Sequence, residues 1–170
     1  MVPHIVYLAN SSGLKVGITR ESQIPTRWMD QGAQQALAIL RVQTRFQSGL
    51  VEVAFKDYVN DKTAWQAMLK GRAPELDLPA QRDALLEKVA PALAAINARF
   101  GQSVIEVLDH TPVELEYPVH NYPVKVTSLD FDKTPLVGGT LLGIKGQYLI
   151  FDTGVINIRK FGGYHVTARA

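Results

Sequence analysis

Two short apolar runs near the N-terminus, residues 4–9 (HIVYLA) and 14–19 (LKVGIT), flank an Asn-Ser-Ser-Gly tetrapeptide. Such residues between two β-type runs predict a hairpin, because they accept positive φ or form local side-chain hydrogen bonds. The second run alternates between an apolar face and a face formed by Lys15, Gly17 and Thr19. Since the apolar face must be buried, the hairpin belongs to a larger sheet, and this restricts the chain to folds built around that sheet.

The open face of residues 14–19 carries a cation, a residue without a side chain and a hydroxyl. Gly17 lets a ligand approach the backbone closely beside the Lys15 ammonium, which is what a phosphate-contacting surface needs. Gly17 and Thr19 are therefore candidate nucleic-acid contacts. The same letters are also typical of an ordinary edge hairpin with a solvated lysine, and this alternative stays open.

The composition indicates a folded domain without covalent cross-links. With 170 residues, of which 46% are hydrophobic, the chain can form one packed domain or one domain with a small appendage. The absence of cysteine excludes disulfides and thiolate metal sites. The chain lacks a run of about 18 apolar residues and a signal peptide, so we expect a soluble, cytoplasmic protein that does not engage a membrane.

The net charge of +2 hides an uneven distribution along the chain. Residues 1–72 hold nine Lys or Arg against five Asp or Glu, residues 73–132 hold four against ten, and residues 133–170 hold five against one. The two basic ends could share one face for a polyanion, with the acidic middle turned away. Scattered, solvated charge explains the same counts equally well.

A helix is expected between Pro25, which suits a first helical turn, and Gly32, which can end it. Arg27 then lies near the helix N-terminus, where backbone N–H groups and the helix dipole favour an anion. An arginine there could clamp a phosphate in a bidentate manner. The alternative is a surface arginine that stacks on Trp28 or pairs with Asp30.

Residues 40–46 alternate between apolar and polar side chains, which predicts a half-buried strand. Arg41 and Arg45 lie on its open face, where they could follow a nucleic-acid backbone. Such a face is often simply hydrated.

A second helix is expected over residues 48–59, with Ser48 as its N-cap. Glu52 lies on or beside the apolar stripe of this helix, so its carboxylate could point into a cleft. There it could hold a hard divalent cation, Mg²⁺ or Mn²⁺, with water completing the coordination shell. The alternative is an i,i+4 ion pair with Lys56, worth roughly a few tenths of a kcal/mol.

The middle of the chain is interpreted as scaffold. A short helix capped by Asp61 is followed by a loop over residues 71–79 and a helix over residues 80–100 that Pro91 kinks or splits. Beyond residue 100 the composition becomes β-type, and turn signals separate short strands in the pattern of a meander or small barrel. The expected strands cover residues 103–108, 113–119, 124–129, 136–142, 148–152 and 155–159.

Basic and aromatic residues recur in this C-terminal part and could form a surface for nucleic acid. They are Lys145, Tyr148, Arg159, Lys160, Tyr164 and His165, of which Lys145 is the candidate contact. Turn lysines and structural tyrosines explain the same letters without a ligand.

Val6-Tyr7 followed by Lys15-Val16-Gly17 resembles the paired strand motifs of the GIY-YIG nuclease superfamily. The likeness is closest to the divergent branch whose second motif reads Lys-aliphatic-Gly-Ile-Thr. That superfamily places an arginine on its first helix and a glutamate on a later helix, and Arg27 and Glu52 match this order within roughly the first 60 residues.

The chain departs from that pattern at both motifs. Ile5 stands where the first motif has glycine, Lys15 stands where the second has tyrosine, and the connection between the motifs is short. In the superfamily the tyrosines bear on activation of the attacking water. The loss of one of them therefore concerns catalysis more than binding.

The whole chain also resembles a bacterial family catalogued as a domain of unknown function, notably at residues 27–33 (RWMDQGA) and 143–148 (GIKGQY). This resemblance implies a longer parent with a Cys-rich segment upstream of His4. The expected fold is α+β. A small mixed sheet with flanking helices, GIY-YIG-like, occupies residues 1–100, and a β-rich meander or small barrel occupies residues 101–170.

By resemblance, the expected function is that of a nucleic-acid-acting protein of the GIY-YIG type, in its strongest form a metal-dependent phosphodiesterase (an endonuclease). Tyr7 would help to activate water, Arg27 would stabilise charge on the phosphate, and Glu52 would hold Mg²⁺ or Mn²⁺. Lys15, as a nearby cation, would favour the Tyr7 phenolate.

Two alternatives remain at this stage. One is a catalytically inactive module that binds DNA or RNA, and the other is a protein-interaction or regulatory domain of a longer chain. The sequence does not distinguish DNA from RNA and does not define the oligomeric state.

Overall fold

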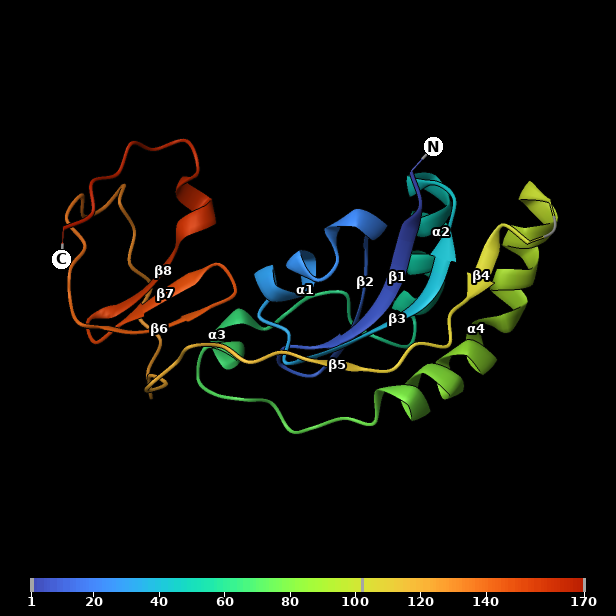
Figure 1. Cartoon of the computed structure of the whole chain (residues 1–170), viewed down its shortest axis with the longest axis horizontal. Coiled ribbons are helices and arrows are strands. Elements are labelled where there is room, and N and C mark those ends of the chain that lie inside the picture. The colour runs from blue at the N-terminus through green and yellow to red at the C-terminus, as the bar shows by residue number, and fades with distance from the viewer. Residues whose placement is uncertain (1, 102, 170) are drawn as a thin grey trace.

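The computed structural model of this chain describes residues 2–101 and 103–169. Helices and two antiparallel sheets build an α+β fold, as the sequence predicts. The two sheets lie one after the other along the long axis of the molecule (Figure 1).

The predicted hairpin is confirmed. β1 (His4–Asn10) pairs with β2 (Leu14–Arg20) in an antiparallel register that sets Tyr7 opposite Gly17. The Asn10 side chain closes the turn by accepting a hydrogen bond from the Gly13 amide at 3.2 Å.

β1 lies inside the first sheet. β3 (Gln35–Val42) pairs with its other side, and the short strands β4 (Ile105–Val107) and β5 (Val113–Glu114) pair with β3. Every named strand pair in this sheet is antiparallel, so the expectation of a mixed sheet was wrong. Because β4 and β5 extend it, the first sheet continues past the boundary expected at residue 100.

Most of the helices lie beside the first sheet, whereas the last 3-10 turn lies beside the second (Figure 1). A 3-10 turn, η1 (Glu21–Gln23), and the five-residue α1 (Thr26–Asp30) follow β2, and α2 (Arg45–Lys56) follows β3. The remaining helices are α3 (Trp65–Met68), α4 (Leu78–Phe100) with Pro91 inside it, and the 3-10 turn η2 (Ile158–Phe161). Among the described residues, no helix combines the length and apolarity that a membrane crossing needs.

The start of α2 corrects the sequence analysis. Thr44 is the N-cap: its side chain accepts from the Gln47 amide, and the Gln47 side chain accepts from the Thr44 amide. This capping box starts the helix at Arg45, inside the predicted strand of residues 40–46 and three residues before Ser48. Ser48, the predicted N-cap, is therefore buried inside α2, and Phe46 is 58% exposed on the helix rather than inward-facing on a strand.

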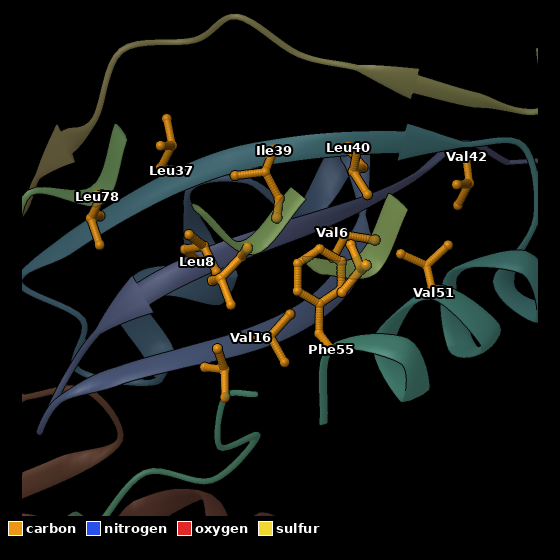
Figure 2. Close-up of a cluster of buried hydrophobic side chains, with 13 residues drawn as sticks. Val6, Leu8, Val16, Leu37, Ile39, Leu40, Val42, Val51, Phe55 and Leu78 are labelled. Atoms are coloured by element: carbon orange, nitrogen blue, oxygen red, sulfur yellow. The ribbon is translucent and has the colours of Figure 1, made fainter. Parts of the chain in front are cut away.

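The main core lies between the first sheet and helices α2 and α4. Alternate residues of β1, Val6 and Leu8, point to this side, where Val51 and Phe55 of α2 meet them (Figure 2). The other β1 residues, including Ile5 and Tyr7, point to the opposite face. The pleat of one central strand thus separates an apolar core from the face that carries the candidate site.

The second sheet is a meander. It consists of β6 (Leu141–Lys145), β7 (Tyr148–Phe151) and β8 (Gly154–Asn157), paired in that order. It forms no closed barrel, and residues 124–129, predicted as a strand, make only an isolated bridge between Ser128 and Val155. Three short strands bury one face against residues 65–69 instead of closing on themselves.

Two phenylalanines of α2 offer a matched test of this packing. Phe55 is fully buried in the main core, so Phe55→Ala should lower the free energy of unfolding by about 3–5 kcal/mol. Phe46→Ala on the exposed side of the same helix should cost about 1 kcal/mol or less. Urea unfolding followed by circular dichroism measures both values, and equal losses would contradict the assigned faces of α2.

Candidate nucleic-acid interface

Tyr7 lies at the centre of the second face of the sheet. It is fully buried, and its ring meets the edge of Trp28 at a centroid distance of 6.0 Å. A Cβ atom placed on Gly17 would lie 2.6 Å from both Cζ and Oη of Tyr7. The space above Gly17 is thus filled by the tyrosine. The prediction that this glycine opens the backbone to a ligand was wrong, because the cross-strand neighbour uses that opening.

A single side-chain oxygen connects the two strands at this point. Gln31 Oε1, just beyond α1, accepts a hydrogen bond from the Tyr7 hydroxyl at 2.9 Å and one from Lys15 Nζ at 2.5 Å. Lys15 Nζ also donates to Thr63 Oγ1 at 2.7 Å. Lys15 is only 4% exposed, so these partners replace the water that would otherwise solvate its charge.

Burial determines the protonation of both groups. It raises the pKa of Tyr7, and the nearby Arg27 guanidinium only partly opposes the increase. Burial, reinforced by the charge of Arg27, lowers the pKa of Lys15 to about 8. Tyr7 is therefore a neutral phenol at pH 7. The raised pKa of Tyr7 is opposite in direction to the predicted stabilisation of the phenolate, because loss of solvation is the largest influence on the Tyr7 pKa.

A basic groove of about 700 Å³ lies beside this buried network. Arg20, Arg27 and Arg45 line it, and none of the described residues lining it is acidic. Its other lining residues are Val2, His4, Ile18, Thr19, Gln23 and Thr44. Arg27 belongs to both environments, because it lines the groove and its charge acts on Tyr7 and Lys15.

The groove unites three predicted site residues, Thr19, Arg27 and Arg45, and adds two that the sequence analysis missed. His4 and Arg20 are paired across the open end of the hairpin, so the strand register brings them to the groove. Gln31 and Thr63 were also missed. Gln31 had two available signals, its i,i+4 spacing from Arg27 and its place in the RWMDQGA segment.

Two predicted nucleic-acid contacts have protein partners instead. Arg41 forms ion pairs with Glu21 at 3.0 Å and with Glu106 at 3.5 Å. These carboxylates compete with any phosphate for the guanidinium. Arg41 lies on β3 and is not among the residues that line the basic groove.

Lys145 is the clearest correction. It is 1% exposed, it donates from Nζ to the Gly71 carbonyl at 2.9 Å, and its Nζ lies 5.8 Å and 5.0 Å from the ring centroids of Tyr117 and Tyr122. Burial lowers its pKa to about 8. The predicted contact with nucleic acid was wrong, because the residue connects two parts of the chain from inside the protein.

The rest of the expected C-terminal basic surface is neutralised. Arg159 pairs with Asp30 at 3.2 Å, and Lys160 pairs with Asp130. The Tyr164 hydroxyl bonds to Asp132. The cations of this surface thus face carboxylates, in contrast to those of the groove.

Glu52 lies on α2, half-buried and outside the groove lining. Burial raises the pKa of its carboxyl, and the cations Lys56 and Arg45 only partly oppose this. Lys56 pairs with Asp61 at 3.0 Å, so the alternative of a Glu52–Lys56 ion pair is not what the side chains form. The described residues contain no group of three or more His, Asp or Glu side chains placed to share a metal ion. Any cation at Glu52 would depend on one carboxylate and water.

Comparison with known proteins agrees with the resemblance along the whole chain. Residues 1–166 match the family described as "Protein of unknown function (DUF2797)". The chain belongs to this family. No curated protein and no solved structure matches the chain. The GIY-YIG likeness of the N-terminal part stays a prediction from its motifs.

Burial of the Lys15 ammonium predicts a pH-dependent stability. Because its pKa falls to about 8 on folding, the unfolded chain binds more protons above pH 8, and stability should increase between about pH 8 and 9.5. Lys15→Met should reduce this increase, whose slope for one such group approaches about 1.4 kcal/mol per pH unit. Lys62→Met, at an exposed lysine, is the control. Urea unfolding at several pH values in this range measures the slope of the free energy of unfolding against pH. The same slope in Lys15→Met as in the wild type would refute the buried charge.

Proposed function

We propose that this protein acts on nucleic acid by holding the sugar–phosphate backbone in the basic groove. The observation that carries the proposal is the groove itself, where three arginines converge and no acidic residue lines the wall. Guanidinium groups suit phosphate because each can donate two parallel hydrogen bonds. Thr19 and Thr44 add hydroxyls at the same wall.

The N-terminus of α2 strengthens the positive potential. Thr44, its N-cap, and Arg45, its first residue, both line the groove, so the positive end of the helix dipole lies there. Two acidic residues near the groove are engaged elsewhere, Glu21 with Arg41 and Asp30 with Arg159, and Glu52, on which Arg45 acts, lies outside the lining. A polyanion at the groove would therefore meet an excess of positive charge.

The predicted likeness to GIY-YIG proteins supports nucleic acid rather than a small anion. The two strand motifs bring Tyr7 and Lys15 together, and Arg27 lies between this pair and the groove, as the family pattern implies for a phosphate-contacting arginine. The buried tyrosine and lysine favour binding over cleavage, because neither reaches the groove surface.

Cleavage of the backbone is the second candidate. It is favoured by the electrostatic proximity of Tyr7 to both Arg27 and Glu52, the residues that the resemblance assigns to catalysis. Glu52 fits a single carboxylate ligand, since its charge is partly desolvated and near cations only partly compensate it. Bound Mg²⁺ would neutralise charge at the leaving oxygen.

Arginine substitutions test the groove. Arg27→Ala and Arg45→Ala should each weaken binding of labelled single- or double-stranded DNA or RNA by about tenfold, because each removes a charged phosphate contact. Each should also lower the slope of log K against log salt by roughly one. Arg82→Ala, on α4 outside the groove, should change neither. If no oligonucleotide binds with a salt dependence, the proposal fails and a protein-interaction role gains support.

A carboxylate substitution tests cleavage separately from binding. If the protein cleaves nucleic acid with Mg²⁺ or Mn²⁺, Glu52→Gln should reduce the rate on the order of 100-fold, since it removes the proposed metal ligand. Metal-free binding should persist, and Glu87→Gln on the exposed side of α4 should behave like the wild type. Metal-dependent cleavage that survives Glu52→Gln would remove Glu52 from the site. Binding without cleavage would support the catalytically inactive binding module.

A further inference from the structure

We infer that Gln31 is the positioning residue of the candidate site, and that the C-terminal meander holds Gln31 in place. This inference deepens the proposed function, and its effect on binding rests on that function. The contacts themselves join residues 29–33 to the turn at residues 145–147 and to the buried pair Tyr7 and Lys15.

Gln31 is the common acceptor of the site. Tyr7 comes from β1 and Lys15 from β2, and the structure gives both donors the same oxygen of Gln31. Arg27, which lines the groove, lies one helical turn before Gln31. The place of Gln31 therefore sets the direction of the phenol, the ammonium and the helix that carries the groove arginine.

α1 cannot fix Gln31 by itself. The helix has five residues, and Gln31 is its C-cap. Isolated helices of this length have no stability of their own in water. The position of Gln31 must then come from tertiary contacts at the end of α1.

The turn of the second sheet supplies one such contact. Gly146 has φ of +59°, and a Cβ placed on it would lie 2.9 Å from the Asp30 carbonyl oxygen and 3.1 Å from the Gly32 nitrogen. The turn backbone thus packs directly against both neighbours of Gln31. The two segments that carry the whole-chain family resemblance, residues 27–33 and 143–148, meet at this contact.

Side chains from the C-terminal part hold the same segment at two more points. The Tyr117 hydroxyl donates to the Ala33 carbonyl at 2.8 Å, and Arg159 pairs with Asp30 at 3.2 Å. Lys145, beside Gly146, is itself held under Tyr117 and bonded to the Gly71 carbonyl. The turn of the meander, Tyr117 and Arg159 thus clamp the end of α1. This contact gives a structural reason for the segment at residues 143–148.

Titration of the Lys15 amine tests Gln31 without any nucleic acid. Gln31→Glu places a carboxylate within reach of Lys15 Nζ, so the Lys15 midpoint, measured by NMR of the ¹³Cε and ¹⁵Nζ signals, should increase by about one pH unit or more. Lys15→Arg assigns the signal. Gln81→Glu, on an exposed part of α4, should leave the midpoint unchanged. An unchanged midpoint in Gln31→Glu overturns the inference.

A glycine pair tests the clamp. Gly146→Ala should shift the Lys15 signals, because the added methyl must displace the end of α1. Gly163→Ala, where the new methyl meets nothing within 4 Å, should not shift them. Arg159→Ala, which removes only an exposed ion pair, should give a smaller shift in the same direction and covers the case in which Gly146→Ala fails to fold. Unchanged Lys15 signals in folded Gly146→Ala or in Arg159→Ala overturn the clamp.

Binding measurements distinguish this inference from the proposed function. If both hold, Gln31→Ala weakens oligonucleotide binding although Gln31 does not line the groove. Shifted Lys15 signals with no nucleic-acid binding in the wild type would keep the inference and refute the proposed function. Unshifted Lys15 signals in the variants, together with salt-dependent binding by the wild type, would refute the inference and keep the proposed function.

Discussion

The buried contact of Tyr7, Lys15 and Gln31 is the constraint on which the rest of the structure depends. A tyrosine at the centre of a sheet leaves its hydroxyl in a dry environment, where an unpaired polar group costs roughly 1–3 kcal/mol. Gln31 supplies the missing partner and Gly17 supplies the room. Because Lys15 shares that partner, a charge is buried as well, and Thr63 from the segment after α2 must cover it. Helix α1, the hairpin and the loop after α2 are thereby fixed with respect to one another.

The distribution of ion pairs explains where the protein is open to an anion. Two exposed cations of the C-terminal part are compensated, since Lys160 and Arg159 meet Asp130 and Asp30. The N-terminal arginines of the groove have no acidic neighbour in its lining. The described residues that line the groove all come from residues 2–45, so its positive charge comes from the N-terminal part of the chain.

The same geometry bears on how the protein works. The groove offers phosphate a set of arginines at the surface, whereas the phenol that the nuclease likeness assigns to catalysis lies behind them as a neutral group. This arrangement is the reason why we propose binding through charge ahead of cleavage. The turn of the meander and Tyr117 contact the end of the helix that carries Arg27, so the C-terminal part helps to position the groove.

Local rules of the chain determined the α+β class, the hairpin, the helix that carries Arg27 and the long scaffold helix, because turn residues and periodicity act over a few residues. They also brought Thr19, Arg27 and Arg45 into view. Competing local signals misplaced the start of α2, where a capping box at Thr44 prevailed over an alternating pattern. Only the tertiary structure decided that the Tyr7 ring fills the space above Gly17, that Lys145 is buried and that Gln31 connects two strands. These outcomes depend on partners far apart in sequence, and burial of a charge is a property of the packed molecule that no single segment encodes.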